Sequence, residues 1–131
     1  MRLAVAVVGL LLVAAIVAIA APPAGSDPDS PKARWYRGLY QPGSSSPCCA
    51  ISDCRPVRHW RIVDGHYEVK LEKSVFGDQA PDEYVAVPPR AVLPNEVSQE
   101  DDPVLCWHPY SFNGAATPAE GVTCFLRSMG G

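Results

Sequence analysis

Apolar and polar side chains alternate along two neighbouring segments of the chain, residues 57–63 and residues 66–73. A period of two places every second side chain on the same face of a β-strand. In the second segment the apolar face consists of Tyr67, Val69 and Leu71. Asp64-Gly65 lies between the segments, and this dipeptide between two alternating runs is a strong hairpin signal. We therefore predict a β-hairpin here.

Three further segments favour strands, and the breaks between them are short. Residues 83–87 end at Pro88-Pro89, and residues 104–107 and 122–126 are both rich in β-favouring side chains. We expect one helical turn at residues 90–93 and an acidic loop at residues 95–103. The sum predicts a mainly β domain: a small antiparallel sheet, or a partly open SH3-like barrel, of about five strands.

One short helix is expected at residues 32–40. Pro31 suits the first turn of a helix and Gly38 suits its end. Trp35 and Leu39, at i and i+4 spacing, would share the face that packs on the rest of the domain.

The N-terminus has the pattern of an export segment. Residues 3–20 carry no charge, follow a single basic residue, Arg2, and end in Ala18-Ile19-Ala20, the small-x-small motif of a signal peptidase site. We predict a signal peptide at 1–20, with an uncleaved membrane anchor as the alternative. Residues 21–31, rich in Pro, Ser and Asp, read as a flexible linker, and 32–131 as a single small β domain. The location would be periplasmic or secreted, or anchored in the inner membrane facing the periplasm.

Charge argues against two classes of partner. The formal net charge is −3, and loss of Arg2 with the export segment would make it −4. Nucleic acids and anionic lipids both require clustered Lys and Arg. We therefore expect no nucleic-acid partner, and contact with a membrane only through the N-terminal segment if it is uncleaved.

The residues that say most about the chemistry of this chain are its five cysteines: Cys48, Cys49, Cys54, Cys106 and Cys124. Behind an export segment, cysteines meet an oxidising compartment and tend to pair. An odd number leaves at least one thiol over. Cys106 and Cys124 lie in two sequential strands and are expected to face and bridge each other, with Cys54 bonded to Cys48 or Cys49. The alternative ties the cysteine-rich segment across to the two strands.

A metal or thiol site is the functional alternative to a disulfide scaffold. The candidate ligands for Cu(I) or Zn(II) include Cys48, Cys49, Cys54 and His108, with Cys106 and Cys124 as further thiols. The spacing of Cys49 and Cys54 differs from the C-x-x-C of thioredoxin-like enzymes. The scaffold is the favoured interpretation, and it requires no cofactor.

Aromatic residues indicate a binding surface. Trp107, His108, Tyr110 and Phe112 enter a loop, and large aromatic side chains provide contact area at low entropic cost. We expect a protein or glycan partner of the envelope to dock there. A rigid loop over residues 107–113 would also suit a small inhibitor of a foreign hydrolase. We find no catalytic motif, so an enzyme is not expected.

One resemblance covers nearly all of the expected mature chain. The motif Cys48-Cys49-Ala50-Ile51-Ser52-Asp53-Cys54-Arg55-Pro56, followed by Val87-Pro88-Pro89, Cys106 and Cys124-Phe125, resembles small uncharacterised exported proteins of alphaproteobacteria. The resemblance implies an envelope or secreted location and brings no known activity with it. The expected function is a non-enzymatic, disulfide-stabilised binding or accessory domain, with envelope metal or thiol handling as the alternative.

Overall fold

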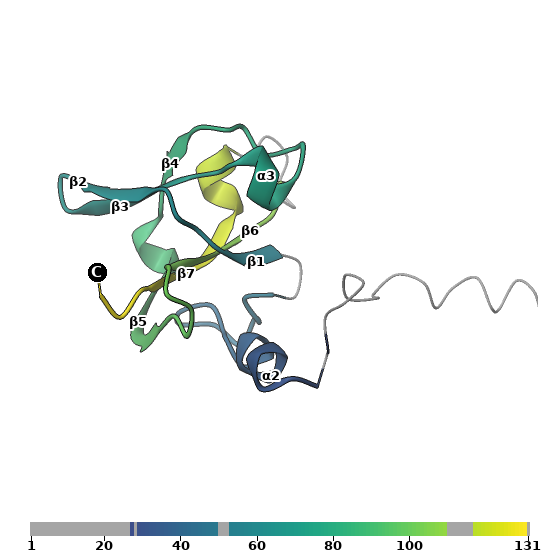
Figure 1. The fold of residues 1–131 in the computed structure, drawn as a ribbon. Coiled ribbons are helices and arrows are strands. Elements are labelled where there is room, and N and C mark those ends of the chain that lie inside the picture. Colours follow the sequence, from purple (N-terminus) through teal and green to yellow (C-terminus); the bar gives the residue numbers. More distant parts are fainter. Residues whose placement is uncertain (1–26, 28, 50–52, 110–116, 131) are drawn as a thin grey trace, which may run out of the picture. The chain divides into compact units, whose positions relative to one another are not determined.

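A computed structural model describes residues 27, 29–49, 53–109 and 117–130. Residues 35–131 group into one compact unit, and residues 1–34 group into a second. The strands of the first unit form two sheets, one of four strands and one of three (Figure 1). The predicted mainly β class is confirmed, although the strands divide between two sheets and form no closed barrel in the described part of the chain.

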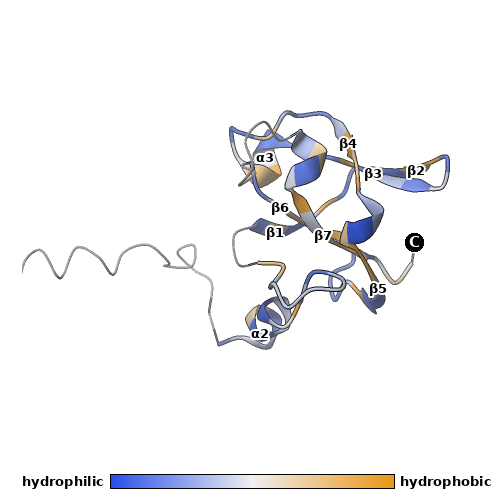
Figure 2. Ribbon diagram, turned by 180° about the vertical axis from the view of Figure 1, so that it is seen from behind, coloured by the Kyte–Doolittle hydropathy of each residue, from blue (hydrophilic) through white to orange (hydrophobic). Residues whose placement is uncertain are grey.

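The four-stranded sheet has the order β1-β6-β7-β5. Its members are β1 (Asp53–Pro56), β5 (Val92–Val97), β6 (Val104–Trp107) and β7 (Val122–Arg127). β6 is antiparallel to both β1 and β7, whereas β5 runs parallel to β7. β7 is therefore a central strand, and its ribbon is hydrophobic over much of its length (Figure 2).

The three-stranded sheet contains the predicted hairpin. Its strands are β2 (Trp60–Val63), β3 (His66–Lys70) and β4 (Tyr84–Ala86), all antiparallel. Asp64 and Gly65 join the first two with positive φ angles of 49° and 79°. Positive φ at both central residues is the type I′ pattern, whose twist matches that of the flanking strands. The hairpin prediction is confirmed.

Helices are short in this fold. In the described residues they are α2 (Pro31–Arg37), α3 (Lys73–Phe76) and the 3₁₀ turns η1 (Pro89–Ala91) and η2 (Pro118–Gly121). The short helix ending at Gly38 and the helical turn near Arg90 were both expected from the sequence. α3 was not, because four residues give no readable helical periodicity.

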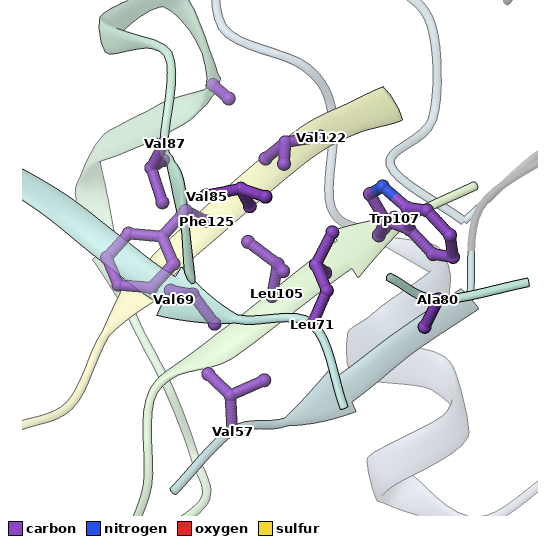
Figure 3. Close-up of a cluster of buried hydrophobic side chains, with 11 residues drawn as sticks. Val57, Val69, Leu71, Ala80, Val85, Val87, Leu105, Trp107, Val122 and Phe125 are labelled. Carbon is purple, nitrogen blue, oxygen red and sulfur yellow. The ribbon is translucent and has the colours of Figure 1, made fainter. Parts of the chain in front are cut away.

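The first of two hydrophobic cores fills the space between the sheets. Phe125 and Leu105 of the four-stranded sheet meet Val69 of β3, Leu71 just beyond it, and Val57 (Figure 3). Four of these five side chains have no measurable exposure, and Val57 has 2%. Tyr67, on the predicted apolar face of the hairpin, packs on Phe125 with ring centroids 4.9 Å apart.

The second core covers the opposite face of the four-stranded sheet. Its buried members are Leu39, Cys48, Leu93, Val104, Cys106, Cys124 and Leu126. Trp35 packs against this core together with Leu39, as the sequence predicted. β6 and β7 thus have side chains buried on both faces, which explains why their sequences read as continuous apolar runs and not as alternation.

A β-bulge adjusts the two faces of β7. The register between β6 and β7 shifts between Cys106 and Trp107. Val122 therefore belongs to the first core although Cys124, two residues later, belongs to the second. A bulge adds one residue to one strand and so changes which face the following side chains occupy. Here it aligns Cys124 with Cys106.

The predicted export segment, residues 1–20, lies outside the described residues. Within the ranges that the structure does describe, we find no helix with the length and apolar character needed to cross a membrane.

Candidate thiol site

Three cysteines form a row across the four-stranded sheet. Cys106 on β6 is the register partner of Cys54 on β1 and also of Cys124 on β7. Directly opposite residues on neighbouring antiparallel strands place their side chains on the same face of the sheet. The row therefore belongs to the second core, with which all five cysteines are associated.

Cys48 and Cys124 form a disulfide that ties the segment before β1 to the central strand β7. Their Cα atoms lie 5.7 Å apart, and 76 residues separate them in sequence. Both side chains are fully buried. The backbone N–H of Cys48 donates to the carbonyl oxygen of Leu39, 2.9 Å away, which holds this segment against the core. The position of this bridge, buried and between two distant segments, is that of a structural disulfide.

The other three cysteines form a single group, which we name the thiol cluster: Cys49, Cys54 and Cys106. Their Sγ atoms all lie within 4.8 Å of one another. The Sγ atom of Cys54 is at bonding distance from those of both Cys49 and Cys106, with Cα separations of 6.1 Å and 3.9 Å. A sulfur atom joins only one disulfide at a time. When Cys54 is oxidised, it is therefore bonded to either Cys49 or Cys106, and the other cysteine of the cluster is a thiol.

The expected bridge between Cys106 and Cys124 is wrong. The two residues do face each other across β6 and β7, as predicted, but Cys124 is bonded to Cys48. The alternative, in which the cysteine-rich segment is tied across to these strands, is the arrangement found. The expected local pairing of Cys54 with Cys49 is one of the two bridges that the position of Cys54 allows.

Exposure differs sharply within the thiol cluster. Cys106 is fully buried, whereas Cys49 and Cys54 are partly exposed. Reactions with an outside molecule depend on access to the sulfur. An outside molecule can therefore reach the sulfurs of Cys49 and Cys54 more readily than the buried sulfur of Cys106.

The hydroxyl of Thr123 links the structural bridge to the thiol cluster. Its Oγ1 lies 3.3 Å from the carbonyl oxygen of Cys48 and 3.2 Å from that of Cys106. It can donate to either acceptor, so the backbone on both sides of the cysteine row is held by one side chain. This contact helps to fix the positions from which the sulfurs meet.

A contact between a tyrosine and a carboxylate holds the C-terminal end of α2 near the second core. The hydroxyl of Tyr36 donates to Oε1 of Glu100 at 3.1 Å. Burial raises the pKa of Tyr36, and the charge and hydrogen bond of Glu100 raise it further, while the positive charge of Arg55 acts in the opposite direction. Tyr36 therefore stays a neutral donor throughout the physiological range.

The predicted aromatic binding surface is not supported where the structure describes it. Trp107 is 3% exposed and belongs to the first core, and its Nε1 donates to the carbonyl oxygen of Pro118 at 2.9 Å. His108 is partly exposed, and burial lowers its pKa. Tyr110 and Phe112 lie outside the described residues, as does most of the loop considered for a hydrolase inhibitor.

The group of possible metal ligands differs from the set expected from the sequence. Among the described residues it contains Cys49, Cys54 and Cys106, all three of them expected candidates, and it leaves out the expected Cys48, Cys124 and His108. Cys48 is in the structural disulfide. Cys106 was a candidate from the sequence, but its approach to Cys54 was not predicted, because that approach depends on β1, a strand that the motif around Cys54 did not reveal.

Comparison with known proteins gives no match: no family, curated protein or solved structure resembles the chain significantly.

Proposed function

We propose that this chain is an exported accessory domain of the bacterial envelope that exchanges thiols and disulfides through Cys49, Cys54 and Cys106. The observation that carries the proposal is the position of Cys54, whose sulfur is at bonding distance from two other cysteines. The proposal selects the thiol-handling alternative and keeps the accessory role, in line with a sequence in which we find no catalytic motif.

The exchange between the two states needs no outside oxidant. In one state Cys49 and Cys54 are bonded and Cys106 is a thiol. The thiolate of Cys106 attacks the sulfur of Cys54, a Cys54–Cys106 bond forms, and Cys49 leaves as a thiolate. One proton moves from Cys106 to Cys49, so atoms and electrons balance.

The two states differ in where the reactive thiol lies. When Cys54 is bonded to Cys49, the remaining thiol is Cys106, which is fully buried. When Cys54 is bonded to Cys106, the remaining thiol is Cys49, which is partly exposed. The exchange therefore carries a thiol from the interior to the surface. There it would meet an envelope protein that carries a dithiol or a disulfide.

The structural bridge supports this role because it keeps the frame intact during exchange. Cys48–Cys124 is buried and joins two segments far apart in sequence, so a partner reaches it less readily than it reaches Cys49. Several cysteines at disulfide distance are consistent with an oxidising compartment. The periplasm or the outside of the cell is the location that we propose.

Alkylation of the native oxidised protein, followed by peptide mass spectrometry, tests the proposal. We expect one alkylated thiol, located at Cys49. Molecules in which Cys106 is the thiol should disappear slowly, because exchange converts them to the state with a reactive Cys49. In Cys49→Ser the Cys54–Cys106 bridge should form, and the native protein should no longer be alkylated. In Cys106→Ser the Cys49–Cys54 bridge should form, with the same result.

Two results would contradict the proposal. One is a wild-type protein whose only bridge besides Cys48–Cys124 joins the same pair under every condition. The other is a wild-type protein that forms no mixed disulfide with a small disulfide such as oxidised glutathione. His108→Asn is the matched control, because His108 is partly exposed and outside the thiol cluster.

A further inference from the structure

The thiol cluster has a second chemical use when it is reduced. We propose that Cys49, Cys54 and Cys106 then bind one copper(I) ion through three thiolates. This inference goes beyond thiol exchange, although both use the same side chains. It depends on the mutual placement of the three sulfurs and on the number of ligands that they provide.

The three sulfur atoms lie near enough to one another to share one metal ion once the bridge is opened. Three thiolates around a single ion, each at a metal–sulfur distance of about 2.3 Å, lie about 4 Å from one another in a trigonal plane. The three Sγ atoms lie within 4.8 Å of one another. Once the bridge is broken, small side-chain rotations are enough to reach the metal-bound arrangement.

The backbone holds two of the ligands in fixed positions. Cys54 and Cys106 are register partners on β1 and β6, so the strand pairing sets their separation. Cys49 directly follows Cys48, which the buried disulfide to Cys124 fixes in the core. The positions of Cys54 and Cys106 therefore do not depend on the cluster bridge, and Cys49 is attached directly to a fixed residue. A preorganised site loses less entropy when it binds.

The number of ligands favours copper(I). Structural zinc sites are almost always tetrahedral with four protein ligands. Within the described part of the chain, the ligand group contains three sulfurs and no histidine or carboxylate. Soft thiolate ligands suit copper(I), and three of them complete a trigonal copper(I) site. Zinc would need a water molecule as its fourth ligand here. The partial exposure of Cys49 and Cys54 lowers the cost of placing charge there.

Loading the site requires reduction of one disulfide. A dithiol reductant supplies two electrons and two protons, the cluster bridge opens to two thiols, and the dithiol itself becomes a disulfide. The three thiols then lose their protons as copper(I) binds. Cys48–Cys124 stays oxidised under mild reduction because both sulfurs are fully buried.

Copper(I) titration of the mildly reduced full-length protein tests the inference. Under anaerobic conditions the protein competes for copper(I) with a chromophoric chelator, and mass spectrometry confirms that Cys48–Cys124 is intact. We expect one equivalent of copper bound. Cys49→Ser, Cys54→Ser and Cys106→Ser should each weaken binding at least tenfold. His108→Asn should bind copper as the wild type does. Because Cys49 is partly exposed, Cys49→Ser should keep the fold, and weaker binding by this variant then reports the loss of a ligand.

Binding of copper that is unchanged in Cys54→Ser would overturn the inference, as would stoichiometric zinc binding that copper(I) does not displace. Absence of copper binding by wild-type protein with a native near-ultraviolet circular dichroism spectrum would also overturn it. The exchange assays are carried out without metal. Failure of copper binding with intact exchange therefore rejects this inference alone, and failure of exchange with intact copper binding rejects only the proposed function.

Discussion

Cys124 lies directly opposite Cys106 on the neighbouring strand and is nevertheless bonded to Cys48, 76 residues earlier in the chain. This choice of partner leaves Cys106 to the thiol cluster. It also divides the five cysteines into a buried bridge and a group of three neighbouring sulfurs. The two groups lie side by side in one core.

Loss of the structural bridge should be the most destabilising change at the cysteines. A disulfide that closes a loop of this length lowers the entropy of the unfolded chain, which stabilises the fold by about 4.5 kcal/mol in the chain-entropy estimate. We expect Cys48→Ala combined with Cys124→Ala to lower the free energy of unfolding in urea by about that amount. Cys49→Ala, which leaves this bridge in place, is the control. Equal losses in both proteins would show that the bridge has no special structural role.

Gly121 should not tolerate a side chain. A Cβ atom added there would overlap the carbonyl oxygen of His108 and lie 2.8 Å from Nε1 of Trp107. Backbone and a buried ring cannot both move away cheaply, so Gly121→Ala should destabilise the fold by about 2 kcal/mol. Gly130→Ala meets nothing within 4 Å and should be neutral. Denaturant midpoints of the two variants, compared with the wild type, give the answer.

Removing the hydroxyl of Tyr36 should weaken the attachment of residues 35–40. The hydrogen bond to Glu100 is partly buried, and its loss is expected to cost about 1 kcal/mol. Tyr36→Phe tests this by thermal or urea unfolding. The matched variant is Tyr40→Phe, because the side chain of Tyr40 is half exposed. If both variants unfold alike, the contact with Glu100 contributes nothing to stability.

Acidification should destabilise the protein in part through His108. Burial lowers its pKa in the folded state, so below the unfolded pKa of about 6.5 the unfolded chain takes up the proton more readily. The free energy of unfolding should therefore fall as the pH decreases from 7.5 through 6.5, and His108→Asn should show a shallower fall. An identical pH dependence in the two proteins would exclude this contribution.

The hairpin and the two apolar strands, β6 and β7, could be predicted because each depends on a local sequence pattern. Asp64-Gly65 has few alternatives to a tight turn, and residues 66–71 alternate cleanly. Residues 104–107 and 122–126 are too apolar for anything except a buried element. These features depend on neighbours in the chain, which is why sequence reasoning reached them.

What the sequence did not reveal depends on partners far away in the chain. β1 contains Asp53, Arg55 and Pro56, a composition typical of a loop, and forms a strand because β6 provides its hydrogen bonds. β5 begins where one helical turn was expected to end and runs into the predicted acidic loop, stabilised by parallel pairing with β7. The choice of partner for Cys124 and the burial of Trp107 likewise follow from tertiary packing.

The central place of β7 has a consequence for the order of folding. Residues 122–127 separate β6 from β5, so the four-stranded sheet cannot assemble until this late segment has been synthesised. Cys48 is synthesised 76 residues before its partner Cys124, so it cannot form its native disulfide until then. A nascent chain that stops short of residue 122 should accordingly remain without its main sheet, however complete its hairpin is.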